Sequence, residues 1–335
     1  MKTISSKVPS IFFRPFFLSS LLCCLTAAVS ARETGVTAQE LLDRMAHATY
    51  EMNYDGTFIY RQGKQMDTMR LIHKFGEDGE NERIVSLTGH EREVIRNNQS
   101  VTCIFPDSHS VMVDKVHAQK LLPMPEDLDR LTAHYTLAVA GEDRIAGKEA
   151  WIVTIRPDDR FRYGYQLWIG KTDHLLLKSE LKNSSGYILE QILFTRLDVL
   201  DNIPDEWLKS SISGAGYTRY DSTAPEHPAE ATNGNHWTVM WMPNGFSMSN
   251  HAKQAVVASD NLVDHMVYTD GLAMVSVFIE RIKDPSQFVP GPSRIGAVNA
   301  FAKLTNGYQV TAVGEVPQTT VQKMAISVVT GNSVR

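Results

Sequence analysis

Cysteine is nearly absent from this sequence, which has three in 335 residues. Two of them, Cys23 and Cys24, lie in an apolar segment near the amino terminus, and only Cys103 follows that segment. A chain left with one cysteine cannot form an internal disulfide, so cross-links do not stabilise this fold. Cys103 alternates with Val101 and Phe105, which predicts a small buried apolar side chain, with a reactive thiol as the alternative.

An excess of positive charge is also missing. Lys and Arg number 33 against 38 Asp and Glu, which gives a formal net charge of −5. Without a basic excess we expect no binding to nucleic acid. A content of 43% apolar and 21% charged residues excludes a mainly disordered chain, and 335 residues leave room for about two domains.

The motifs of common enzymes are missing as well. In "SISGAG" the serine lies on the wrong side of its glycines for a nucleophile elbow, and "GAGYTR" lacks the third glycine of a dinucleotide site. Eleven histidines are scattered without an H-E-x-x-H motif or a pair at metal-ligand spacing. Asp158 and Asp159 fit a turn better than an acid–base pair. The sequence therefore predicts a protein that is not an enzyme, with no catalytic residue, no metal site and no cofactor.

Residues 1–31 have the pattern of a signal peptide. Lys2, Lys7 and Arg14 precede the apolar run "FFLSSLLCCLTAAVSA", which ends in small residues at Val29 and Ala31. We expect export to the periplasm of a Gram-negative bacterium, with cleavage near Ala31. Cleavage removes three basic residues and no acidic one, so the mature chain is more acidic than the whole sequence.

Two other interpretations of this segment stay open. Cys23 and Cys24 raise the alternative of a lipoprotein signal, although neither follows the small residue that lipid attachment requires. An uncleaved anchor is the other alternative, although the apolar run is shorter than the roughly 20 residues of a membrane-spanning helix.

The mature chain begins with a pattern typical of one amphipathic helix, in "TAQELLDRMAHATYEM". Thr37 and Glu40 have the spacing of a capping box, and the helix should end before Asp55-Gly56. Apolar residues recur at helical spacing and give one apolar stripe. The residues of the stripe are Leu41, Met45, Ala48 and Met52.

After this helix the apolar period changes to two, which predicts an antiparallel meander. The predicted strands are "GTFIYRQ", "MDTMRLIHKF", "RIVSL", "REVIRN" and "SVTCIF", then, after a mostly helical "PEDLDRLTAH", "EAWIVTIRP", "RYGYQLWIG", "LLLKSELK" and "YILEQILF". Nine or ten successive strands with one long helix indicate a mainly β, α+β fold in which residues 32–204 form a large curved antiparallel sheet or a part-closed barrel (half-barrel), with something packed in its mouth. A doubly wound α/β fold is disfavoured, because strands and helices do not alternate.

Residues 205–235 are rich in Gly, Ser, Pro and Asn, which is typical of an interdomain linker. Residues 236–335 then begin with "HWTVMWMPNGF" and are interpreted as a small α+β domain. We expect Trp237, Val239 and Trp241 to share the buried face of a strand. Hairpins are predicted at Asp270-Gly271 and Asn306-Gly307, and a final amphipathic helix has its apolar stripe on Val321, Met324, Ala325 and Val328.

Several segments, in this order and spacing, resemble the MucB/RseB family of periplasmic regulators of envelope-stress sigma factors (sigma-E or AlgU type). They are "YDGTFIY", "RFRYGYQLWIGKTDHLLLKSEL", "ILEQILFT", "WTVMWMPNGF", "YTDGLAMVSVFIE" and "VTAVGEVP". The resemblance implies an amino-terminal half-barrel similar to the lipoprotein carriers LolA and LolB, followed by a small carboxy-terminal domain. The linker of this chain is long.

The resemblance also implies a function without catalysis. Members bind the periplasmic segment of a membrane anti-sigma factor of the RseA/MucA type, shield it from the first regulatory protease, and are released by lipid-type ligands such as lipopolysaccharide. A periplasmic lipid or lipoprotein carrier is the alternative, although a carrier needs the half-barrel alone. An exported hydrolase is a third hypothesis, for which the sequence shows no nucleophile. The oligomeric state stays open, a homo-oligomer included.

Two sets of residues are candidates for binding. Pro243 and Gly245 should stop the strand and turn Phe246 outward toward the anti-sigma partner, with Tyr268 and Leu272 extending the same patch. The half-barrel strands have more bulky apolar residues than one helix can cover, which predicts a cavity for a lipid or acyl chain. The candidates for that cavity are Trp168, Leu175, Leu177 and Leu181.

Overall fold

Two β-sheets make up most of the computed structural model, which describes residues 35–77, 79–114, 128–222, 237–255, 262–282 and 288–331. The predicted signal peptide, residues 1–31, lies outside the described residues. Residues Val36–Arg335 form one unit by their internal contacts, and both sheets belong to that unit. Among the described residues, no helix is both long enough and apolar enough to cross a membrane.

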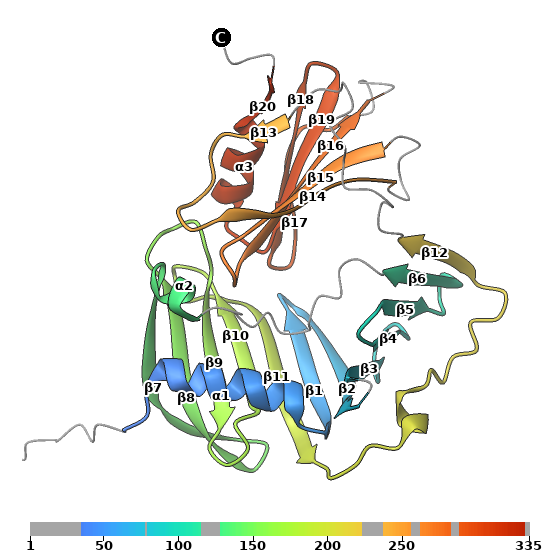
Figure 1. The fold of residues 1–335 in the computed structure, drawn as a ribbon, viewed down its shortest axis with the longest axis vertical. Helices are drawn as coiled ribbons and strands as arrows, with labels where there is room; N and C mark the ends of the chain where they lie inside the picture. Colours follow the sequence, from blue (N-terminus) through green and yellow to red (C-terminus); the bar gives the residue numbers. More distant parts are fainter. Residues whose placement is uncertain are drawn as a thin grey trace, which may run out of the picture. The chain divides into compact units, whose positions relative to one another are not determined.

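The large sheet has twelve strands, in the spatial order β12-β6-β5-β4-β3-β2-β1-β11-β10-β9-β8-β7 (Figure 1). They are β1 (Tyr54–Gln62), β2 (Gln65–Gly76), β3 (Gly79–Ser86), β4 (Glu93–Arg96), β5 (Val101–Phe105), β6 (Ser110–Asp114), β7 (Tyr135–Ile145), β8 (Lys148–Pro157), β9 (Gly164–Gly170), β10 (Leu176–Lys182), β11 (Ile188–Val199) and β12 (Thr218–Ser222). The short helix α2 (Leu128–Thr132) precedes β7.

The large sheet consists of two antiparallel meanders that meet in its centre. The strands β1 to β6 form one meander and β7 to β11 form the other. Their junction is the antiparallel pair β1–β11, in which Tyr60 lies opposite Ile192. The sheet is mixed, because β12 runs parallel to β6.

The helix α1 (Ala38–Glu51) covers part of one face of this sheet, as the sequence predicts. It begins where expected: the hydroxyl of its N-cap residue Thr37 accepts a hydrogen bond from the backbone N–H of Glu40 at 3.1 Å, which satisfies one of the free donors of the first turn. Its buried side chains Leu41, Leu42 and Met45 pack against strands β7 to β10.

Besides β12, two strands of the large sheet are missing from the sequence prediction. β7 is an edge strand paired only with β8, and most of its residues are exposed, so it has no clear period of two. β6 follows β5 after a short turn and contains a single buried residue, Val113. The nine strands that were predicted for the large sheet are all present.

The first part of the predicted linker contains ordered elements that lie on the large sheet. These are the 3-10 helix η1 (Asp205–Leu208) and strand β12, whereas residues 223–236 lie outside the described residues. Glu93, 1% exposed, anchors this segment by accepting hydrogen bonds from the hydroxyls of Ser210 and Ser211. Arg83 also donates to Glu93 at 2.6 Å, and these donors lower the pKa of the Glu93 carboxyl although its burial acts in the opposite direction.

The small carboxy-terminal domain has a six-stranded antiparallel sheet, in the order β14-β15-β16-β19-β18-β17, and a two-stranded pair, β13 with β20. Its elements are β13 (Trp237–Val239), β14 (Ser247–Ala255), β15 (Leu262–Thr269), β16 (Met274–Arg281), β17 (Gly291–Ile295), β18 (Val298–Thr305), β19 (Tyr308–Gly314), α3 (Gln318–Ile326) and β20 (Val328–Thr330). Both predicted hairpins are present, and Asn306 and Gly307 adopt the positive φ angles, 52° and 78°, of a tight hairpin turn.

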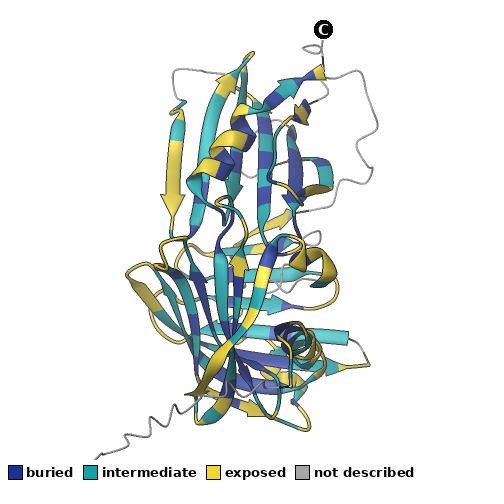
Figure 2. Ribbon diagram, turned by 90° about the vertical axis from the view of Figure 1, so that its left-hand side faces the viewer, coloured by how far each residue is buried: buried dark blue, intermediate teal, exposed yellow. Residues whose placement is uncertain are grey.

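The helix α3 packs on β18 and β19 and closes one core over the small sheet. In Figure 2 it carries buried positions on one side and exposed positions on the other. Trp237 and Val239 belong to this core as predicted, and Trp241 packs at its margin. One detail of the prediction is wrong: Val328 is buried, but it lies in β20 opposite Val239, because the helix ends at Ile326.

The fold class predicted from the sequence is confirmed. The protein is mainly β, with a large curved sheet, a helix packed on it and a separate small carboxy-terminal sheet domain.

Candidate functional site

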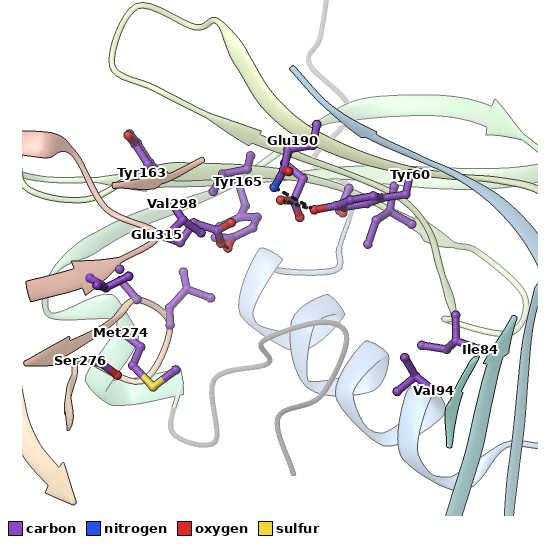
Figure 3. Close-up of a pocket in the computed structure, with 18 of the residues that line it drawn as sticks. Tyr60, Ile84, Val94, Tyr163, Tyr165, Glu190, Met274, Ser276, Val298 and Glu315 are labelled. Carbon is purple, nitrogen blue, oxygen red and sulfur yellow. Dashed lines mark hydrogen bonds between the residues drawn. The ribbon is translucent and has the colours of Figure 1, made fainter. Parts of the chain in front are cut away.

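A cavity of about 1040 Å³ lies between the large sheet and the small domain. One wall consists of side chains from β1 to β5, β7 and β9 to β11, and the opposite wall consists of residues from β15, β16, β18 and β19 and the turns beside them. Figure 3 shows that Tyr60, Ile84, Val94 and Tyr165 approach it from the large sheet and Met274 and Val298 from the small domain. Apolar side chains dominate the lining, as is typical of a ligand pocket.

Strand alternation explains why the large sheet provides this wall. On β9, Leu167 and Ile169 lie beneath α1, and Tyr165, on the same face, extends beyond the helix into the cavity. On β10, Ser179 and Leu181 line the cavity, and on β11 Glu190 and Ile192 do so. The cavity is therefore the part of the inner face of the sheet that α1 leaves uncovered.

Glu190 introduces a carboxyl group into this apolar wall. The hydroxyl of Tyr60 on β1 donates to Glu190 Oε2 at 2.8 Å (Figure 3). The amide of Gln62 donates to the Tyr60 hydroxyl at 3.2 Å. Burial and the neighbouring Glu190 carboxylate raise the pKa of Tyr60, so this phenol keeps its proton and acts as a hydrogen-bond donor. Burial also raises the pKa of Glu190.

A second carboxyl group reaches the same place from the small domain. Glu315, directly after β19, hydrogen-bonds to Glu190 and accepts a hydrogen bond from the Tyr165 hydroxyl at 3.3 Å. Burial and the charge of Glu190 raise the pKa of Glu315 to about 7. The cavity thus contains a pair of carboxyl groups from two different domains, of which one holds a proton at mildly acidic pH.

A buried ion pair joins the two domains beside the cavity. Arg162, in the β8–β9 connection, has a fully buried guanidinium group whose Nη1 lies 2.9 Å from Oδ2 of Asp270 in the small domain. The Tyr135 hydroxyl donates to the same carboxylate at 2.9 Å. The guanidinium also lies over the rings of Tyr135 and Phe246, at 5.4 and 5.2 Å from their centroids. Such a pair is costly to break from one side, because the remaining charge stays buried.

Further polar contacts extend this junction along the turn that follows β13. Arg130 donates to the backbone oxygen of Gly245 at 3.0 Å and to the hydroxyl of Ser247 at 2.6 Å. Gly245 has a φ angle of 85°, and a Cβ atom at this position would lie 2.1 Å from Nε2 of His134. Glycine is therefore required here by the backbone conformation and by the approach of the large domain.

The four residues predicted to bind the partner lie at this junction or in the small core. Phe246 is 7% exposed and Tyr268 is 4% exposed, and both belong to the core of the small domain. The expectation that the turn directs Phe246 outward is therefore wrong, because Arg162 covers its ring. Pro243 is buried, and Leu272 inserts into the apolar cluster beneath α1 and lines the cavity.

The four lipid-cavity candidates are separated by the structure. Leu181 lines the cavity, whereas Leu175, Leu177 and Trp168 are buried in a hydrophobic cluster of the large domain and do not line it. Trp168 alternates with Leu167 and Ile169 and so faces away from α1; its indole N–H donates to Asp143 at 2.9 Å. Cys103 also lines the cavity, and burial raises the pKa of its thiol, so it is less nucleophilic than an ordinary cysteine.

Sequence reasoning missed the polar residues of the site. Glu190 stands in the apolar strand "YILEQILF", and Arg162 stands among aromatic residues in "RFRYGYQ"; a charge inside an apolar segment is a signal that could have been used. Glu315 and Tyr60 gave no such signal, because only the folded chain brings them together. Within the described residues there is no cluster of His, Cys, Asp and Glu side chains able to hold a metal ion.

Profiles of two domains match this sequence. The MucB/RseB N-terminal domain matches residues 37–212, and the MucB/RseB C-terminal domain matches residues 231–329. This chain belongs to the MucB/RseB family. The assignment made from the quoted segments is thereby confirmed for both domains.

Among curated MucB/RseB relatives, the sigma factor AlgU regulatory protein MucB of Pseudomonas aeruginosa is 29% identical over 321 residues, covering 92% of this chain and 96% of the relative. The sigma-E factor regulatory proteins RseB of Haemophilus influenzae and Escherichia coli K12 are 24% and 23% identical, over 92% and 85% of this chain and 96% and 88% of their own lengths. These relatives are named as regulatory proteins of sigma factors.

Solved structures agree with this family assignment. The structure described as the complex of Pseudomonas aeruginosa MucA/MucB superposes with a TM-score of 0.69 at 28% identity, covering 88% of this chain and 98% of that chain. A structure of MucB in complex with MucA(peri) gives a TM-score of 0.68 at 28% identity, with the same coverage.

Proposed function

We propose that this chain is a non-enzymatic periplasmic regulator that binds the periplasmic segment of a membrane anti-sigma factor of the RseA/MucA type. The observation that supports this most strongly is the match of both domains, over nearly the whole chain, to a protein whose solved structures include complexes with MucA. Bound to its partner, the chain would shield that segment from regulated proteolysis. Export with cleavage near Ala31 belongs to the same proposal.

The architecture supports binding of a lipid-type ligand that releases the partner. The cavity is lined mainly by apolar side chains and lies between the two domains, so an acyl chain bound in it would contact both. A ligand that favours one arrangement of the domains changes the affinity for a partner that favours another. The same cavity is the observation that favours the second candidate function, a lipid or lipoprotein carrier.

Titration calorimetry of the mature chain with the purified periplasmic segment of the anti-sigma factor from the same bacterium tests the partner. We expect a one-to-one complex, and protection of the segment from its first protease when the chain is added. Absence of heat and of protection would contradict the regulatory function.

A fluorescent fatty-acyl probe tests the ligand. We expect binding at tens of micromolar probe or below, and release of the anti-sigma segment as the probe binds. Leu181→Trp should weaken probe binding by narrowing the cavity, whereas the matched substitution Tyr187→Trp, at a side chain that is 62% exposed, should leave it unchanged. Probe binding without any partner binding would favour the carrier instead.

A further inference from the structure

The carboxyl pair Glu190 and Glu315 bridges the two domains at the wall of the cavity. Glu190 lies on β11, beside the central junction of the large sheet, and Glu315 lies directly after β19 in the small domain. The two side chains hydrogen-bond to each other. Ionised carboxylates have only acceptor atoms, so this contact exists only when one of the two carries a proton.

The groups around the pair leave its charge uncompensated. Tyr60 and Gln62 from β1 face Glu190, and Tyr165 from β9 faces Glu315; all three are neutral. At longer range, Arg92 acts on Tyr60, Arg294 acts on Tyr163, and Tyr135 acts on Tyr165. Among the described residues, no lysine, arginine or histidine forms an ion pair with either glutamate. A second negative charge on the pair would therefore be stabilised by solvent alone.

We propose that Glu190 and Glu315 form an acid-sensitive latch between the domains: sharing one proton they hold the end of β19 against β11, and losing that proton to water they separate and open the cavity. The latch is independent of which ligand or partner the chain binds. It adds a regulatory input, external pH, to the function proposed above.

The direction of the pH effect follows from proton binding. Burial and the Glu190 charge raise the pKa of Glu315 to about 7 in the closed arrangement, whereas a separated, hydrated carboxyl returns toward its ordinary value of 4.5. The closed form then binds more protons than the open form between these values. Closure is fully favoured below about pH 4.5, weakens as the pH rises toward 7, and changes no further above that.

The size of the pKa shift of Glu315 sets an upper limit on how strongly pH changes the equilibrium between the closed and open arrangements. One pKa unit corresponds to a tenfold change in the equilibrium between the two arrangements. Both glutamates are only partly buried, which reduces the effect below that bound, so we expect a change on the order of tenfold across the window.

Electron spin resonance distance measurements on the mature chain test the latch directly. Spin labels at Tyr187→Cys in the large domain and Met240→Cys in the small domain use two side chains that are both 62% exposed, in a Cys103→Ser background that removes the native thiol. The ratio of long to short interdomain distances should rise about tenfold from about pH 4.5 to about pH 7.5.

Glu315→Gln supplies the decisive variant. The amide is permanently neutral, still donates to Glu190 and still accepts from Tyr165, so this variant should stay in the short-distance arrangement at every pH. Glu149→Gln is the matched control, because its side chain is 79% exposed, and it should titrate as the parent does. Glu190→Gln repeats the test from the other domain if Glu315→Gln fails to fold.

Two results would overturn the latch. One is a parent distance distribution that does not change with pH, and the other is a Gln variant that keeps the parent's pH dependence. The measurement uses the free chain without partner or lipid, so its outcome is separate from that of the anti-sigma binding experiment.

Discussion

Each of the two sheets of this protein has one main helix packed on one face, but the two helices cover different shares of their sheets. In the small domain, α3 and the pair β13–β20 cover six short strands, and one continuous core results. In the large domain, α1 has a sheet of twelve strands to cover, and it buries only the part formed mainly by β7 to β10. The remaining inner face lines the cavity.

The ratio of helix to sheet thus determines whether an inner face becomes core or binding surface. Apolar side chains beneath a helix are removed from water on folding and stabilise the domain. The same side chains beyond the end of the helix face a space that a ligand can fill, so they contribute less to stability and more to recognition. The junction residues Arg162 and Asp270 hold the small domain over that space.

The largest expected effect on stability comes from substitution at the junction between the two domains. Arg162→Ala should lower the free energy of unfolding by about 3–5 kcal/mol, because Asp270 keeps a buried and unpaired charge. Urea unfolding followed by fluorescence measures it. Arg44→Ala, which removes only an exposed pair with Glu40 on α1, should cost less than about 1 kcal/mol. Equal costs for the two variants would show that the buried ion pair does not hold the junction.

Phe246→Ala should also cost about 3–4 kcal/mol, since the ring lies in the small core and carries the Arg162 guanidinium on its face. The melting temperature should therefore fall clearly. Phe246→Leu, which keeps most of the apolar volume, should recover much of the loss. An unchanged melting temperature for Phe246→Ala would mean that this ring is free for a partner, as the sequence alone suggested.

Substitution of two methionines allows a direct comparison between the closed core and the cavity wall. Met324, on α3, is 0% exposed in the small core, and Met69, on β2, is 5% exposed but lines the cavity. Met324→Ala should cost about 3–4 kcal/mol, whereas Met69→Ala should cost about 1–2 kcal/mol, because its side chain already faces open space on one side. Thermal unfolding of both variants checks the order. A larger loss at Met69 would contradict the contrast between core and cavity wall.

The smallest expected effect concerns the start of α1. Thr37→Ala removes the acceptor for the Glu40 backbone N–H and should cost about 1 kcal/mol. Thr37→Ser keeps the hydroxyl and is the control. Hydrogen exchange should show faster opening of the first turn of α1 in the alanine variant only. A similar acceleration in both variants would assign the effect to lost packing of the threonine methyl group instead.

The sequence predicts the internal strands well and the edge strands poorly. "RYGYQLWIG" and "YILEQILF" form central strands, whose neighbours on both sides require apolar residues. The strands β7 and β14 were not predicted; both are sheet edges with many polar or exposed residues, such as the run "SMSNHAKQA". Alternation is a signal of burial, so it fades where a strand has solvent beside it.

The sequence indicates that a cavity exists, but it does not identify the residues that line it. The excess of apolar strand residues over helix correctly indicates a cavity, but Leu181 is the one candidate of four that lines it. Whether Trp168 lies on the inner or the outer face of the sheet depends on which face is concave. The tertiary structure decides this, not the local sequence. Pairs such as Arg162–Asp270 and Glu190–Glu315 join residues more than a hundred positions apart, so local sequence patterns do not reveal them.

The central pair β1–β11 has a consequence for how this chain folds. Tyr60 and Glu190, which meet there, are 130 positions apart. Each flanking meander can form from local hairpins, but the middle of the sheet requires the closure of a very long loop. During synthesis the amino-terminal half of the chain emerges first, and the inner edge of β1 stays unpaired until β11 follows. We therefore expect refolding in two kinetic phases, a fast one for the meanders and a slow one when the two halves join.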